Sequence, residues 1–217
     1  MKKYDLIVFD WDGTLMDSTG HIVNCMQQAI KQLSMPPLDD SAISHIIGLA
    51  LAEAASTLYP DASEKVIQQL ASTYKQVWLE SSFDPKLFDN AFSLIKQLSE
   101  QELFLGVATG KSRRGLNKVL ESTALSDFFH ATRCADECHS KPHPQMLEEL
   151  IDYFGVAPKA TLMIGDTKYD LQMAHNAGAD SLAISHGAHD AKLLQACQPL
   201  DIVDNLFQAQ QWLNTNL

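Results

Sequence analysis

The chain has 217 residues, of which 46% are hydrophobic and 20% are charged, and its formal net charge at pH 7 is −11. This composition is ordinary for a soluble globular protein and excludes disorder as the main state. The excess of negative charge argues against nucleic acids and anionic membranes as partners. The length fits one large domain, or one domain with a sizeable insertion.

The N-terminus predicts neither a signal peptide nor a membrane span. Only four consecutive apolar residues, 6–9, precede Asp10, which is too few for either. We therefore expect a cytoplasmic protein, either monomeric or homodimeric. Its four cysteines are expected to be free thiols; they are Cys25, Cys134, Cys138 and Cys197.

The first predicted element is a strand over residues 6–9. Its four apolar residues are typical of a strand buried on both faces of a parallel sheet. The run stops at Asp10, Asp12 follows two residues later, and Gly13 lets the backbone turn sharply. A buried strand that delivers two carboxylates into a glycine turn indicates a functional site more than a solvated turn.

Residues 17–82 contain helices and no convincing strand. Apolar residues at helical spacing predict helices over 20–34, from Asp39 or Ser41 to Ile47, over 49–58 and over about 64–81. We therefore predict an all-helical domain over residues 17–82, inserted into a second domain formed by residues 1–16 and 83–217.

From residue 83 onward, strands and helices alternate. Strands are predicted over 103–109, 128–134, 160–166 and 181–187, with helices over about 88–100, from Ser112, over 145–154, up to Gly178, and near 189–196 and 205–214. This alternation predicts βαβ units. The predicted fold class is α/β: a doubly wound parallel sheet, with a Rossmann-like core, and an inserted all-helical domain.

Polar residues follow several predicted strands, at the edge where such sheets bind ligands. They are Asp10 and Asp12, then Thr109, Gly110 and Lys111, then Asp166 and Asp170, with Lys141 on the loop after another strand. Because the carboxyl ends of parallel strands share one edge of the sheet, we expect these residues to converge.

The set Asp10-x-Asp12-Gly-Thr-Leu, Thr109, Lys141-Pro and Gly165-Asp166-Thr-x-x-Asp170, in this order and spacing, resembles the haloacid dehalogenase superfamily of phosphohydrolases. The resemblance covers essentially the whole chain. It implies a covalent aspartyl-phosphate and a bound magnesium ion, and the block 17–82 resembles the small helical cap of that family. The run Asp12-Gly-Thr-Leu-Met-Asp-Ser is similar to the phosphoglycolate phosphatase-like group.

The chemistry of the residues supports the same interpretation independently. Phosphoryl transfer needs an in-line nucleophile, neutralised charge and positioning. Asp10 is the candidate nucleophile, and Asp12 can protonate the leaving oxygen and later deprotonate water. Lys141 would balance the negative charge, while Thr109 and the Gly110 amide would donate hydrogen bonds to phosphate oxygens.

The candidate metal ligands are Asp10, Asp12, Asp166 and Asp170. Hard oxygen ligands suit Mg²⁺, and near Asp12 the ligand would be a backbone carbonyl. Asp170 could instead serve only the N-terminus of its helix by its charge. The spacing of Cys134, Cys138, His139 and His143 resembles a zinc site, but that loop already carries Lys141, and we expect no zinc there.

Several residues keep two interpretations. Lys111 either extends the site or faces solvent. Trp11 is expected to pack below the loop, and Arg113 and Arg114 to lie on a solvated helix face. His21 and His45 could touch the substrate or lie on the surface. The helical block is poor in cations: it has no arginine, and its lysines are Lys31, Lys65 and Lys75.

The predicted function is a magnesium-dependent phosphatase that hydrolyses a small phosphorylated metabolite and resembles phosphoglycolate phosphatase. The alternative on the same scaffold is a sugar-phosphate mutase similar to β-phosphoglucomutase. A dehalogenase has no use for Asp12 or the metal ligands. A phosphorylation-driven receiver also uses an aspartate, Mg²⁺, threonine and lysine, but the Asp-x-Asp turn and the helical block argue against it.

Overall fold

The structure is a computed structural model that describes residues 3–82, 84 and 86–217. At its centre, six parallel strands pair in the order β3-β2-β1-β4-β5-β6. The strands are β1 (Leu6–Phe9), β2 (Phe104–Thr109), β3 (Ala131–Cys134), β4 (Thr161–Gly165), β5 (Asp180–Ile184) and β6 (Asp201–Val203). The strand order reverses at β1, and in such sheets ligands bind at this point, beyond the carboxyl ends of the strands.

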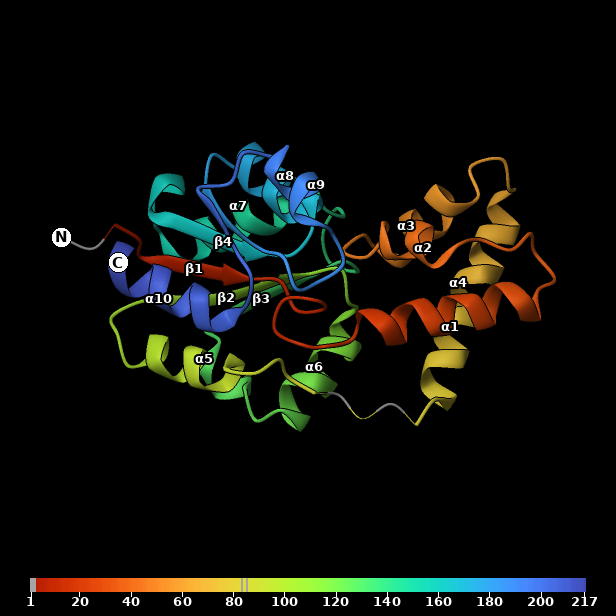
Figure 1. Ribbon diagram of the computed structural model, residues 1–217, viewed down its shortest axis with the longest axis horizontal. Helices are drawn as coiled ribbons and strands as arrows, with labels where there is room; N and C mark the ends of the chain where they lie inside the picture. The colour runs from red at the N-terminus through yellow and green to blue at the C-terminus, as the bar shows by residue number, and fades with distance from the viewer. Residues whose placement is uncertain (1–2, 83, 85) are drawn as a thin grey trace.

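Helices cover both faces of the sheet, which confirms the predicted α/β fold class (Figure 1). One face carries α5 (Ala91–Ser99), α6 (Arg113–Ser122) and α10 (Leu206–Asn216), and the other carries α7 (Gln145–Phe154), α8 (Lys168–Asn176) and α9 (Ala191–Gln195). Side chains of β1 alternate between the two apolar cores, Ile7 and Phe9 on one side, Leu6 and Val8 on the other. The strand that leads to Asp10 is therefore buried on both faces.

A helical insertion separates β1 from β2. It contains α1 (Thr19–Gln32), α2 (Asp40–Ser44), α3 (Leu51–Leu58) and α4 (Glu64–Glu80). These helices bury an apolar core of their own, which includes Met26, Ile30 and Leu70. In Figure 1 the β1 arrow points toward the insertion, which lies beyond the carboxyl ends of the strands. No helix of the described residues has the length and apolar character that crossing a bilayer would take.

Most predicted elements are present, and the differences lie at their ends. The first helix ends at Gln32, because Ser34 adopts a left-handed conformation with φ of 51° before the two prolines. Phe128 belongs to a short 3₁₀ helix rather than to β3. The sixth strand, β6, was not predicted; it has only three residues and lies at the edge of the sheet. The predicted domain boundary at residue 83 lies outside the described residues.

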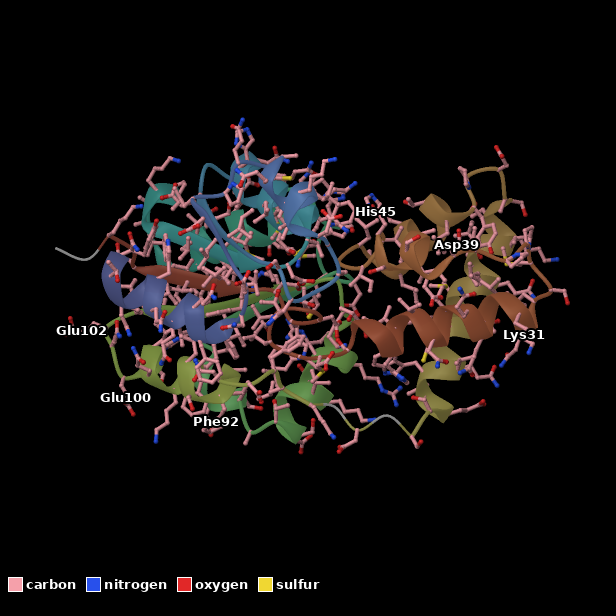
Figure 2. All side chains as sticks on the ribbon, in the orientation of Figure 1. Lys31, Asp39, His45, Phe92, Glu100 and Glu102 are labelled. Carbon is pink, nitrogen blue, oxygen red and sulfur yellow. The ribbon has the colours of Figure 1, made fainter. Side chains whose placement is uncertain are left out.

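The six-stranded sheet and the helices on its two faces are called here the sheet domain. The segment of residues 45–50, called here the 45–50 loop, contacts it directly. The His45 carbonyl accepts hydrogen bonds from the Tyr169 hydroxyl and from His189 Nε2, each at 3.1 Å. The His45 and His189 rings stack with their centroids 5.0 Å apart. Figure 2 shows His45 between the insertion and the sheet domain, whereas Lys31 lies at the end of the insertion away from the sheet.

The same loop also touches the segments that follow β2 and β3. The amide of Ala50 donates to Ser140 Oγ at 2.8 Å. At Gly110 an added Cβ would lie 2.8 Å from the carbonyl oxygens of Gly48 and Leu49. The 45–50 loop therefore contacts the segments that follow β2, β3, β4 and β5, and the polar residues of this edge lie under the insertion.

Candidate active site

Asp10 directly follows β1 and continues its pairing with β4, since its amide donates to the Ile164 carbonyl at 2.9 Å. Its side chain is 2% exposed. Its Oδ1 is 2.7 Å from Lys141 Nζ. Among the described residues, its Oδ2 has no hydrogen-bond partner although it is buried. Burial of a carboxylate oxygen without a hydrogen-bond partner lowers the stability of the fold, and it indicates an oxygen that binds a ligand.

Asp166 follows β4, and its carboxylate lies close to that of Asp10. Thr14 Oγ1 donates to Asp166 Oδ1 at 2.6 Å, and the Ala188 amide donates to Oδ2 at 2.7 Å. These contacts come from the turn after β1 and from the loop after β5. The segments that follow β1 and β5, the two neighbours of β4 in the sheet, therefore fix the orientation of the Asp166 carboxylate.

Asp170 lies in the first turn of α8 and does two jobs. Its Oδ2 accepts from the amide and the hydroxyl of Thr167, at 3.0 and 2.7 Å, in a capping box. Its Oδ1 accepts from Lys141 Nζ at 2.6 Å. Asp170 therefore caps its helix and also reaches the site, because Lys141 bridges it to Asp10, so a role at the helix N-terminus alone does not describe it.

Asp10, Asp166 and Asp170 form one buried cluster, whose nearest carboxylate oxygens all lie within 4.8 Å of one another. Lys141 is the buried cation that contacts it, and one lysine does not neutralise three carboxylates. Burial raises the pKa of Asp10 well above its usual range, and the charges of Asp170 and Asp166 raise it further, against Lys141.

The pKa values of Asp166 and Lys141 are also raised. Burial, with the Asp170 charge, raises the pKa of Asp166 to about 7. Burial alone would lower the pKa of Lys141, but the charges of Asp10 and Asp170 raise it above its usual value. A divalent cation fits these residues: the donor atoms are hard oxygens, one of them lacks a partner, and the negative charge exceeds the positive.

Two glycines make room for Asp166. A Cβ on Gly13, whose φ is 82°, would lie 2.3 Å from Asp166 Oδ2, and a Cβ on Gly187 would lie 2.0 Å from the same atom. The sequence predicts a role for Gly13 in the turn, but not for Gly187, which was predicted to end a strand. Strand β5 ends at Ile184, and Gly187 lies in the loop beyond it.

Asp12 is not a member of the three-carboxylate cluster. Its oxygens both lie 3.0 Å from Lys111 Nζ, and Ser18 Oγ donates to Oδ1 at 2.6 Å. The prediction that a backbone carbonyl near Asp12 binds metal stays a prediction. Of the two interpretations of Lys111, the structure supports the first, because its side chain is 10% exposed and paired.

Thr109 and Gly110 lie at the end of β2, beside β1. Thr109 is 1% exposed, and its Oγ1 accepts from the Lys111 amide at 3.2 Å. Gly110 contacts the 45–50 loop. Their predicted role in binding phosphate stays a prediction, and their position beside Asp10 agrees with it.

Other predicted residues lie away from the cluster. Trp11 is fully buried against Phe129, as expected. Arg113 forms an ion pair with Glu137 instead of facing solvent freely. The four cysteines form no disulfide, and the aspartate cluster is the metal-site candidate found among the described residues.

Sequence reasoning missed three contributors. Thr14 and Ser18 hold the carboxylates of Asp166 and Asp12, and Gly187 makes room for the first of them. Thr14 and Ser18 follow the Asp-x-Asp turn closely, so their proximity to that turn is a usable signal. Gly187 carries no comparable signal, because a glycine after a predicted strand is commonplace.

Comparisons with known proteins agree with this geometry. The family model described as haloacid dehalogenase-like hydrolase matches residues 7–184. A protein named probable phosphatase IndB, from Dickeya dadantii, is 34% identical over 206 residues, covering 92% of this chain and 89% of its own. A phosphoglycolate phosphatase from Vibrio vulnificus is 26% identical over 217 residues, covering 95% of both. A solved haloacid dehalogenase-like family hydrolase from Streptococcus pneumoniae superposes with a TM-score of 0.84 at 25% identity, covering 98% of this chain and 99% of its own.

Replacing Gly187 by alanine should disturb the cluster through Asp166. The added Cβ has no room beside the Asp166 carboxylate, so we expect a loss of stability of about 1–3 kcal/mol and a weaker response to Mg²⁺ in thermal denaturation. Gly20→Ala is the matched control, because a Cβ there meets nothing within 4 Å. A Gly187→Ala protein that Mg²⁺ stabilises as much as wild type would contradict the assignment.

Replacing Asp166 by asparagine should remove a pH-dependent loss of stability from the metal-free protein, so that the variant gains on the wild type as pH rises. Burial raises the pKa of Asp166 in the folded protein to about 7, so the folded state holds this proton more tightly than the unfolded state does. The stability that this proton contributes is fully present below the unfolded-state pKa and is lost as pH rises through the folded-state pKa. The advantage of the variant in chelator should grow from about pH 5 to about pH 7, by at most about 1.4 kcal/mol per pH unit.

Thermal denaturation in chelator and in Mg²⁺ measures this effect. Mg²⁺ should stabilise the wild type and not Asp166→Asn. The exposed Asp152→Asn provides the control for loss of a surface charge. A constant difference between Asp166→Asn and wild type across the pH range would contradict the assignment.

Proposed function

The chain belongs to the haloacid dehalogenase-like hydrolases, and on this premise we propose that it is a Mg²⁺-dependent phosphatase acting on a small phosphomonoester. One observation supports this more than any other: Asp10 Oδ2 is buried at the strand-order reversal and has no partner among the described residues, while Oδ1 is held by Lys141. Lys141 therefore orients the carboxylate through Oδ1, and Oδ2 can react with a substrate or bind a metal ion.

In the first half-reaction, an oxygen of the Asp10 carboxylate attacks the phosphorus of the substrate. The new bond joins phosphorus to Asp10, and the bond from phosphorus to the leaving oxygen breaks. Asp12, in its protonated form, gives its proton to that oxygen, and the alcohol departs. Asp12 is suited to this role because it stands two residues from Asp10 and outside the carboxylate cluster.

In the second half-reaction, the Asp12 carboxylate takes a proton from water, whose oxygen attacks the phosphorus of the aspartyl-phosphate. The bond between phosphorus and the Asp10 oxygen breaks, which frees inorganic phosphate. Asp10 is again a carboxylate, and Asp12 is again protonated. The two carboxylates thereby keep separate roles through the whole cycle.

The other residues bind and orient. Asp10, Asp166 and Asp170 would hold Mg²⁺. When bound, the ion supplies neutralising positive charge for the carboxylates and the phosphate. Lys141 holds Asp10 Oδ1, so that the other oxygen faces the substrate. Thr109 and the Gly110 amide would donate hydrogen bonds to phosphate oxygens.

We assign residues 1–16 and 83–217 to the catalytic domain and residues 17–82 to a cap that selects the substrate. The contacts of the 45–50 loop with the strand ends support this division, because they enclose the polar edge. A phosphoglycolate-like metabolite is the first substrate to test, given the Vibrio vulnificus relative. A panel of phosphorylated metabolites, with both released phosphate and isomerised product measured, separates a phosphatase from a mutase.

Asp10→Asn should abolish phosphate release, by at least about 10⁴-fold, because the amide is a poor nucleophile. The variant should stay folded, since asparagine can still accept a hydrogen bond from Lys141. Asp5→Asn, an exposed carboxylate just before β1, is the control. Turnover by Asp10→Asn close to that of wild type would exclude Asp10 as the nucleophile.

Asp12→Asn should slow turnover by about 10²–10⁴-fold, because it removes the proton donor and the base. With p-nitrophenyl phosphate, whose leaving group needs little protonation, phosphorylated Asp10 should accumulate and be visible by mass spectrometry. Asp17→Asn, an exposed carboxylate in the same segment, is the control. An unchanged rate would remove the acid/base role of Asp12.

A further inference from the structure

Lys111 makes an unusual set of contacts for a residue that follows a strand end. Its Nζ lies 3.0 Å from both oxygens of Asp12. The same ammonium lies 5.1 Å from the centroid of the Trp78 ring, on α4 of the insertion. One cation of the sheet domain thus contacts the proposed acid/base residue and a side chain of the insertion together.

The backbone around Lys111 is held on two sides. Its amide donates to Thr109 Oγ1 at 3.2 Å, and its carbonyl accepts from the Ala135 amide at 3.1 Å. Gly110, the preceding residue, abuts the 45–50 loop. The backbone that carries Lys111 is therefore fixed. With its ammonium paired to Asp12, the side chain has less conformational freedom than that of a lysine on the surface.

The contacts also restrict Asp12. Both Asp12 oxygens accept from Lys111 Nζ at 3.0 Å, and Ser18 Oγ donates to Oδ1 at 2.6 Å. The side chains of Asp12 and Lys111 are only 14% and 10% exposed. A carboxylate held by two donors in a nearly closed site has a defined direction, which a general acid needs in order to reach the leaving oxygen.

Groups of the insertion respond to this pair as well. Burial and the Lys111 charge lower the pKa of His21 on α1. Burial and the Asp12 charge raise the pKa of Tyr74 on α4 well above its usual value. The Lys111–Asp12 pair therefore lies against α1 and α4 of the insertion.

We propose that Lys111 is a positioning residue for the reaction: it orients the Asp12 carboxylate toward the leaving oxygen and links that orientation to the insertion through Trp78. This inference rests on the proposed phosphatase function. A purely structural ion pair would stabilise the fold without favouring one class of leaving group. A recognition site for a second anionic group on the substrate would act on substrate binding.

The test compares leaving groups in Lys111→Met, Lys111→Arg and the control Lys118→Met, an exposed lysine on the same segment of chain. Alkyl phosphates need a proton on the leaving oxygen, and p-nitrophenyl phosphate needs little. We expect kcat/KM of Lys111→Met to fall about 10–100-fold for an alkyl phosphate and far less for p-nitrophenyl phosphate, with KM little changed. Lys111→Arg should recover part of the loss, since its guanidinium can also bind both oxygens.

Three results would overturn the proposal. They are an equal loss for both leaving groups, no loss at all, and a rise in KM confined to substrates with a second negative charge. A crystal structure of Lys111→Met gives a readout without turnover: the Asp12 carboxylate should leave its position, and an unmoved carboxylate also contradicts the proposal. Failure of the proposed function is recognised separately, because the wild type would then release no phosphate from any member of the panel.

Discussion

The site depends on one buried lysine that bridges two buried carboxylates. Lys141 Nζ lies 2.7 Å from Asp10 and 2.6 Å from Asp170, and all three side chains are nearly inaccessible to water. Charges in such a place persist only when they are paired, and removal of one partner costs about 3–5 kcal/mol. Asp166 adds a third carboxylate, which forms no ion pair with a lysine in the part of the chain that the structure describes. The arrangement therefore carries unrelieved repulsion, which a divalent cation would remove, and it stores this cost where the protein needs a ligand.

The sheet makes this crowding possible. Strand β1 is buried on both faces and lies between β2 and β4, so Asp10 emerges at the reversal of strand order with Asp166 beside it. Parallel strands direct their carboxyl ends to one edge. The loop after β5 then supplies an amide for Asp166 and, through Gly187, the space for its carboxylate. Because the Asp166 carboxylate lies so close to Gly187, no residue larger than glycine fits at position 187 without a shift of its neighbours.

Much of this was predictable from the sequence, for a physical reason. A strand that ends in Asp10 or Asp166 has a short-range signature, and the common edge of parallel strands brings such ends together. The pairing of Lys111 was not predictable, because a lysine after a strand end can point to solvent or to the site with the same local sequence. Gly187 was missed because its role depends on a contact across the sheet. The strand β6 has three residues and lies at the edge, so its pattern is too short to identify.

The division of labour between the two parts of the chain follows from these contacts. Every residue of the carboxylate cluster comes from the sheet domain, so the chemistry at phosphorus does not depend on the identity of the insertion's side chains. In the proposed mechanism, in contrast, the leaving group departs on the side of Asp12, and the Lys111–Asp12 pair lies near side chains of α1 and α4. Under this proposal, a residue that selects the leaving group lies next to Asp12, the residue that would protonate it. Changes in α1 or α4 can then alter substrate choice and proton transfer together, while Asp10, Asp166 and Lys141 stay as they are.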